Sequence, residues 1–218
     1  MSFVRDKFSA KFFLFLAIAF ILIHVPIIGN YVKIINTLIH ETGHAIIALF
    51  GGKVETISLF MNSEGATISD QSTWMGSFLT SLAGYTFASF MAFLSFWLLR
   101  RKKEILLIDI LLAFIFFNLI FWLCSFAFAF LFLLIKGSKG VRDHILLLIA
   151  AILLVDSVQS AYEILFLSVL QPQAAGDAAN LARLTGFLPA VFWGLFFFLQ
   201  ALWFCFYGFK RGYYKVGF

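Results

Sequence analysis

Two histidines and a glutamate lie close together in the segment HETGH at residues 40–44, inside an apolar run from about Tyr31 to Phe50. In a helix, residues four apart share one face, so His40 and His44 can direct both imidazoles at one metal ion, with Glu41 beside them. This spacing is the HExxH pattern, in which bound Zn²⁺ lowers the pKa of a water molecule and the glutamate removes its proton. The segment therefore predicts two zinc ligands and a general base.

The apolar setting of the motif is a second indication of function. A charged side chain at the centre of a membrane span costs about 2.5–3.5 kcal/mol on insertion scales, so such residues are by default functional and partnered. The alternative is that His40 and His44 are structural residues that bridge helices without a metal. The motif and its setting together favour a zinc site over that alternative.

A catalytic zinc site needs a third protein ligand and an open position for water. The chain has six aspartates, and four of them lie near the ends of apolar runs or in a hairpin, where a solvated carboxylate needs no special explanation. These four are Asp6, Asp70, Asp109 and Asp143. Two candidates for the third ligand remain, Asp156 and Asp177.

Asp156 lies well inside an apolar run from Ile145 to Leu170 and begins a polar stripe that continues through Gln159, Ser160 and Glu163. This i, i+3, i+4, i+7 spacing places the stripe on one helix face, which we expect to face the bundle interior. At 1.5 Å per residue, His40 and Asp156 each lie roughly 14–17 Å deep in their runs. We therefore expect Asp156 to be the third zinc ligand.

Asp177 lies in a polar loop, Gln171 to Gly186, between two apolar runs. An aspartate just before a helix commonly caps it, which would explain Asp177 without a metal. This residue would reach the zinc site only if the loop folded back into the membrane. Asp177 stays open as the alternative third ligand.

The composition predicts that the chain lies in a bilayer. Of its 218 residues, 62% are hydrophobic and 12% are charged, and the mean hydropathy is +0.99. A soluble domain carries about 25% charged residues. The cations border the apolar runs, as in loops beside membrane ends, and no basic surface with stacking aromatics suggests nucleic-acid binding. The partners that we expect are the lipid bilayer and other membrane proteins.

The apolar runs predict an all-α polytopic membrane protein with about six transmembrane helices, forming one domain over residues 1–218. The stretch Ile105–Ile135 is longer than one span needs, so a seventh span is possible if it breaks near Asn118. After the HExxH helix, residues 53–69 change character. Alternating β-favouring residues around a turn at 62–65 predict a short β-hairpin there.

Several segments resemble one known family. They are residues 39–45 around the motif, Gly51-Gly52 with the hairpin that follows, Ala83-Gly84-Tyr85, and residues 176–189 followed by Trp193-Gly194. These segments are similar to the site-2 protease family of intramembrane zinc metallopeptidases, particularly its short bacterial branch. The resemblance implies a zinc peptidase with the motif glutamate as general base and an aspartate from a later span as third ligand. It also implies that the hairpin offers an edge to an extended substrate.

The chain departs from that family at one place. The better-known members carry the ligand aspartate in an Asn-Pro-x-Pro-x-Leu-Asp-Gly segment, whereas the prolines here are Pro26, Pro172 and Pro189, and no Asp-Gly pair occurs. The choice of Asp156 therefore rests on its burial and on the geometry of the stripe.

The function that we expect is that of a zinc metalloendopeptidase in a bacterial cytoplasmic membrane, which hydrolyses transmembrane or membrane-proximal segments of other proteins. His40, His44 and Asp156 would hold Zn²⁺ and Glu41 would activate the water. The alternative is a non-proteolytic membrane protein that keeps zinc for structure or uses the polar stripe for transport. The sequence leaves the substrate's identity and the oligomeric state open.

Overall fold

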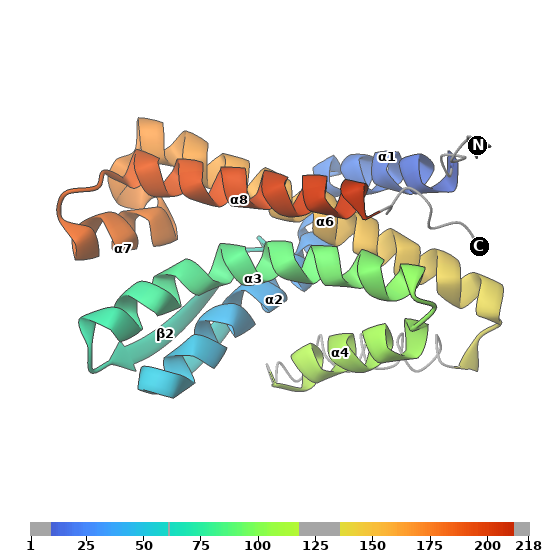
Figure 1. Ribbon diagram of the computed structural model, residues 1–218, viewed down its shortest axis with the longest axis horizontal. Coiled ribbons are helices and arrows are strands. Elements are labelled where there is room, and N and C mark those ends of the chain that lie inside the picture. The colour runs from blue at the N-terminus through green and yellow to red at the C-terminus, as the bar shows by residue number, and fades with distance from the viewer. Residues whose placement is uncertain (1–9, 61, 118–135, 212–218) are drawn as a thin grey trace, which may run out of the picture.

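Helices dominate the structure, a computed structural model that describes residues 10–60, 62–117 and 136–211 (Figure 1). The helices are α1 (Ala10–His24), α2 (Ile28–Gly51), α3 (Trp74–Arg100), α4 (Glu104–Phe117), α6 (Lys139–Leu170), α7 (Gly176–Thr185) and α8 (Ala190–Lys210). The strands are β1 (Gly52–Leu59) and β2 (Gly65–Gln71), and a single 3₁₀ turn spans Pro172–Ala174. The predicted helical fold with one short hairpin is therefore confirmed.

Helices α1 and α2 meet at a sharp bend of 107°. Pro26 lies in the break between them, and proline stops a helix because it lacks an amide hydrogen and its ring collides with the preceding turn. Ile27 completes the break with a left-handed backbone, φ 67°. Together the two helices make one broken span or a re-entrant loop, where hydropathy predicted two separate spans.

Three further helices, α3, α6 and α8, are each long and apolar enough to cross a bilayer. With the bent α1–α2 pair, the described part of the chain holds up to four spans. Helix α4 begins the long apolar stretch Ile105–Ile135, but residues 118–135, including the expected break near Asn118, lie outside the described residues. An integral membrane protein is thus supported, and the count of six spans stays a prediction.

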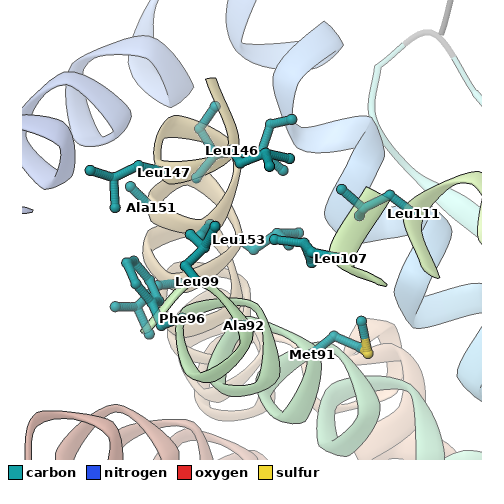
Figure 2. Packing of buried hydrophobic residues seen from close by; sticks show 14 of the residues in the cluster. Met91, Ala92, Phe96, Leu99, Leu107, Leu111, Leu146, Leu147, Ala151 and Leu153 are labelled. Atoms are coloured by element: carbon teal, nitrogen blue, oxygen red, sulfur yellow. The ribbon is translucent and has the colours of Figure 1, made fainter. Parts of the chain in front are cut away.

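The main hydrophobic core is formed where α3 packs on α6, with α1 and α4 against them. Figure 2 shows Phe96 and Leu99 of α3 meeting Leu153 of α6, while Leu107 of α4 closes another side. These side chains are almost completely buried. Because such interiors are close-packed, this core fixes the relative positions of the helices that carry the polar residues described below.

A second hydrophobic cluster joins α7 to α6 and α8, and in Figure 1 α7 lies at one end of that helix pair. Ala175, Ala178 and Leu181 are buried there, and the small alanines let α7 approach closely. Trp74 at the start of α3 donates its indole N–H to the carbonyl of Leu184, at 2.9 Å. The segment predicted as a polar loop therefore contains a helix that packs on its neighbours. The buried residues of this helix are mostly alanines, which contribute little to the hydropathy of the segment.

The hairpin is a two-stranded antiparallel sheet with a register from Gly52 opposite Gln71 to Leu59 opposite Gly65, interrupted by one irregularity between Val54 and Thr56. It packs on α2, which contacts both strands. Gln71 donates a side-chain hydrogen bond to the carbonyl of Ala48 at 3.3 Å. The hairpin therefore lies along the helix that carries the HExxH motif.

Candidate metal centre

Three potential metal-ligating atoms converge at the middle of α2. His40 and His44 lie one helical turn apart, and their Nε2 atoms are 3.0 Å from each other. The third atom comes from α7: Asp177 Oδ2 lies 3.3 Å from His40 Nε2 and 3.2 Å from His44 Nε2. The structure thus gathers two imidazoles and one carboxylate at one point, from segments more than 130 residues apart in the sequence.

The triangle formed by these atoms has the size that a zinc ion requires. Zinc binds histidine nitrogen and carboxylate oxygen at about 2.0–2.2 Å in tetrahedral sites, so neighbouring ligand atoms lie about 3.3–3.5 Å apart. The observed edges of 3.0, 3.2 and 3.3 Å are close to that spacing. Two histidines with one carboxylate also form a known catalytic donor set, which leaves the fourth position for water. The residues present therefore fit a zinc ion.

A main-chain acceptor orients His44. Its Nδ1 lies 2.6 Å from the carbonyl oxygen of Thr80 on α3, so Nδ1 carries the proton and donates it. With its proton on Nδ1, a neutral His44 would present the Nε2 lone pair to the other two atoms of the triangle. Metal-binding histidines commonly donate their second ring nitrogen to such a partner, which fixes the ring and raises its basicity.

Gly84 on α3 gives the two imidazoles their space. A Cβ atom at this position would lie 2.5 Å from His40 Nε2 and 2.5 Å from His44 Nε2. Tyr85, the next residue, holds the other side of His40, with ring centroids 4.5 Å apart in an edge-on arrangement. Helix α3 therefore shapes the metal centre although it contributes no ligand atom to the group of three.

The first turn of α7 places Asp177 in the group, where the helix N-terminus favours a negative charge. Burial alone would raise the pKa of Asp177, but the imidazoles of His44 and His40 beside its carboxylate hold that pKa well below its usual range. The carboxyl group is therefore ionised, as a metal ligand must be. The N-cap position of α7 is Ala175, which makes no side-chain capping bond.

Glu41 lies beside the histidines on α2 and is only 5% exposed. Thr67 on β2 donates its hydroxyl to Glu41 Oε2 at 2.6 Å. A second link ties the hairpin turn to the same helix, since Thr37 donates to the carbonyl of Ser63 at 2.8 Å. The hairpin thus holds the glutamate carboxylate in a defined position.

Asp156, the expected third ligand, lies outside this group of three residues. It is 4% exposed on α6 and lies near Asn36 and Lys33 of α2. It lines the same cavity as the histidines but is not one of the three converging residues. The physical reason is that α7 packs on α8, α3 and α6 and brings its own carboxylate to the histidines.

The sequence held one signal for Asp177, namely the likeness of residues 176–189 to the short bacterial branch of site-2 proteases. The expected burial favoured Asp156, because hydropathy indicates how deep a residue lies within a long apolar segment. Hydropathy cannot indicate that a short helix after that segment packs beside the histidines.

A polar cavity of about 1160 Å³ opens beside the three converging residues. Its walls come from α2, β2, α3, α6 and α7, and they include Glu41, Asp156 and the whole of β2. Polar side chains at membrane depth normally face a bundle interior or such a cavity. The cavity is therefore the natural place for a substrate to meet the candidate metal centre.

Comparison with known proteins gives one match. The family model described as Peptidase M50B-like matches residues 13–208, which include every residue of the candidate centre. Neither the curated proteins nor the solved structures contain a significant match.

Proposed function

The chain belongs to the Peptidase M50B-like family, and on that basis we propose that it is a membrane-embedded zinc metalloendopeptidase. Its substrates are transmembrane or membrane-proximal segments of other membrane proteins. The observation that carries the proposal is the triangle of His40 Nε2, His44 Nε2 and Asp177 Oδ2, with Glu41 beside it in a cavity between membrane helices.

In this proposal His40, His44 and Asp177 hold the metal, and Asp177 replaces Asp156 as the third ligand. The 3.2–3.3 Å separations support that choice. When bound, Zn²⁺ supplies Lewis acidity that lowers the pKa of a coordinated water and polarises the scissile carbonyl.

Glu41 acts as the general base. It accepts the proton of the attacking water and later passes it to the leaving amine, as the glutamate of HExxH sites does. The hydroxyl of Thr67 donates a hydrogen bond to Oε2 of Glu41 and so holds the carboxylate in place. Thr67 is thus a positioning residue for the glutamate.

The substrate runs in an extended conformation beside β2. All of β2 lines the cavity, and its second edge has no strand partner among the described residues. Strand addition would supply main-chain hydrogen bonds to a segment that has unwound from its helix. Glu41 lies under this strand, so a peptide paired there passes close to the base.

Substitution of Glu41 tests the mechanism. Purified Glu41→Gln protein should retain zinc but lose cleavage of a model membrane substrate by about 10³-fold or more, because the change removes the general base that takes the water proton. Full cleavage by this variant would refute the role of Glu41. Tight zinc in the unaltered protein together with no turnover on any membrane substrate would favour the non-proteolytic alternative.

Separate substitutions of the two aspartates test the ligand assignment. Asp177→Asn should lower bound zinc, measured by metal analysis of detergent-purified protein, whereas Asp156→Asn should leave the zinc content unchanged. Zinc loss with the Asp156 change alone would return the third ligand to α6.

We further propose that the protein acts as one membrane domain over residues 1–218, with six spans, in a bacterial cytoplasmic membrane. Cysteine accessibility scanning of single-cysteine variants, which reports the side of the membrane on which each loop lies, tests the span count directly.

A further inference from the structure

The polar stripe of α6 faces the cavity without taking part in the metal centre. Asp156, Ser160 and Glu163 line the cavity wall opposite α2, where Lys33 and Asn36 face them. A buried carboxylate at membrane depth is costly, so this corner requires its own explanation.

Asn36 has an unused hydrogen-bonding atom. It is 4% exposed, and its Oδ1 has no hydrogen-bond partner. A buried acceptor without a donor costs free energy, and most buried polar atoms are satisfied. Asp156 lines the same cavity, and an ionised carboxylate cannot donate a hydrogen bond to Oδ1.

Lys33 is the one lysine or arginine among the residues that line the cavity, and it faces both Glu163 and Asp156. Lys33 lies 4.0 Å from Glu163 Oε1, which in addition accepts a 2.9 Å hydrogen bond from Gln159. In the described part of the chain, no ion pair within 4.0 Å involves Asp156.

The whole cavity is anionic. Its walls carry one lysine against six carboxyl groups, so a bound divalent metal would still leave three uncompensated negative charges. The carboxyl residues are Glu41, Glu64, Asp70, Asp156, Glu163 and Asp177.

We propose that Asp156, Asn36 and Glu163 form a subsite that takes a basic side chain of the substrate, lysine or arginine. An ammonium or guanidinium group offers several N–H donors and no acceptor, which is what the Asn36 Oδ1 and the Asp156 carboxylate require together. The inference rests on the proposed peptidase function and adds a substrate preference to it.

The position of the subsite sets where the basic residue lies in the substrate. Asn36 precedes His40 by four residues on α2, a distance of about 6 Å along the helix axis. An extended peptide advances about 3.3 Å per residue, so the basic residue is about two positions from the scissile bond.

The test is a binding experiment that does not depend on turnover. Zinc-loaded Glu41→Gln protein in nanodiscs is titrated with fluorescent peptides that carry one lysine at successive positions, and with a matched series carrying methionine. The lysine peptide should bind about tenfold more tightly at one position, about two residues from the centre of the bound segment, because hydrogen bonds to charged groups are stronger. Adding Asp156→Asn to the same protein should reduce that preference to about twofold or less.

Two variants accompany the measurement. Asp109→Asn, which removes an exposed carboxyl group of α4 outside the cavity, should leave the lysine preference unchanged. Glu163 is 51% exposed in its side chain, so Glu163→Gln should fold normally and lower the preference partially even if Asp156→Asn proves unstable.

Equal binding of the lysine and methionine series would overturn the subsite, as would an equal loss of both in Asp156→Asn. Loss of zinc in Asp156→Asn would also overturn it, because that residue would then be a ligand. Cleavage by the protein with Glu41 intact is measured separately. A lysine preference in binding without any cleavage would refute the peptidase function and leave the subsite standing.

Discussion

Replacing Gly84 by alanine would place a methyl group against both histidines of the proposed metal centre. The added Cβ would lie 2.5 Å from His40 Nε2 and from His44 Nε2, whereas nonbonded carbon contacts lie at about 3.5–4.0 Å. Each imidazole, or the backbone of α3, must therefore shift by about 1 Å. Ligand distances in zinc sites vary by only about 0.2 Å, so this shift is several times larger than the site tolerates.

The expected effect on zinc binding is at least as large as that of losing a group that orients a ligand. Such losses reduce metal affinity by 10–100-fold, and because Gly84→Ala displaces two ligands at once we expect about 100-fold, or about 2.8 kcal/mol. Zinc affinity is measured by competition with a chromophoric chelator, using detergent-purified protein. Proteolysis of a model substrate should fall with zinc occupancy and recover partly at high zinc concentration.

Gly140 provides the matched control, since it lies in α6 and a Cβ there would meet nothing within 4 Å. Gly140→Ala should bind zinc like the unaltered protein, and both variants should show cooperative thermal unfolding. Unchanged zinc affinity in a folded Gly84→Ala protein would refute the metal centre as described, because the two Nε2 atoms could not then be the ligands.

Three other predictions concern contacts around the centre. Thr67→Val removes the hydroxyl that donates to Glu41 and keeps the side-chain shape, so it should lower kcat by about 10–100-fold with zinc content unchanged. Thr67→Ser keeps the hydroxyl and should therefore retain most of the original kcat. An equal loss of kcat in the serine variant would contradict the positioning role. Trp74→Phe removes the hydrogen bond to Leu184 and should cost about 1 kcal/mol, seen as a fall in Tm of about 2–4 °C, whereas Trp203→Phe on the exposed face of α8 should change Tm little. Because zinc would join α2 to α7, saturating zinc at 100 times its Kd should stabilise the protein by about 2.7 kcal/mol, and a chelator should reverse that gain; Asp177→Asn should show neither effect.

The parts of the fold that hydropathy and turn chemistry control could be predicted from the sequence. Helix α6 ends at Leu170 as its apolar run predicts, although it begins at Lys139, six residues before that run, and the hairpin forms after Gly51 because β-favouring residues flank a turn there. The HExxH spacing likewise places His40 and His44 on one helix face, as helical periodicity requires.

The features that escaped prediction depend on tertiary contacts. Hydropathy reads α1 and α2 as two spans, but Pro26 bends them into one broken unit. A run of alanines reads as a polar loop, although the buried Ala175 and Ala178 dock α7 against its neighbours. Depth along a straight span favoured Asp156, whereas Asp177 reaches the histidines from the separate helix α7. The periodicity of a single segment cannot predict where such a helix packs.

The distance in sequence between the members of the metal centre has a consequence for biosynthesis. Asp177 is made 137 residues after His40. If Asp177 is the third ligand, a nascent chain on the ribosome holds an incomplete centre until α7 has emerged and docked. Hydrolytic activity would then arise only after that docking, which protects neighbouring nascent membrane proteins from premature cleavage.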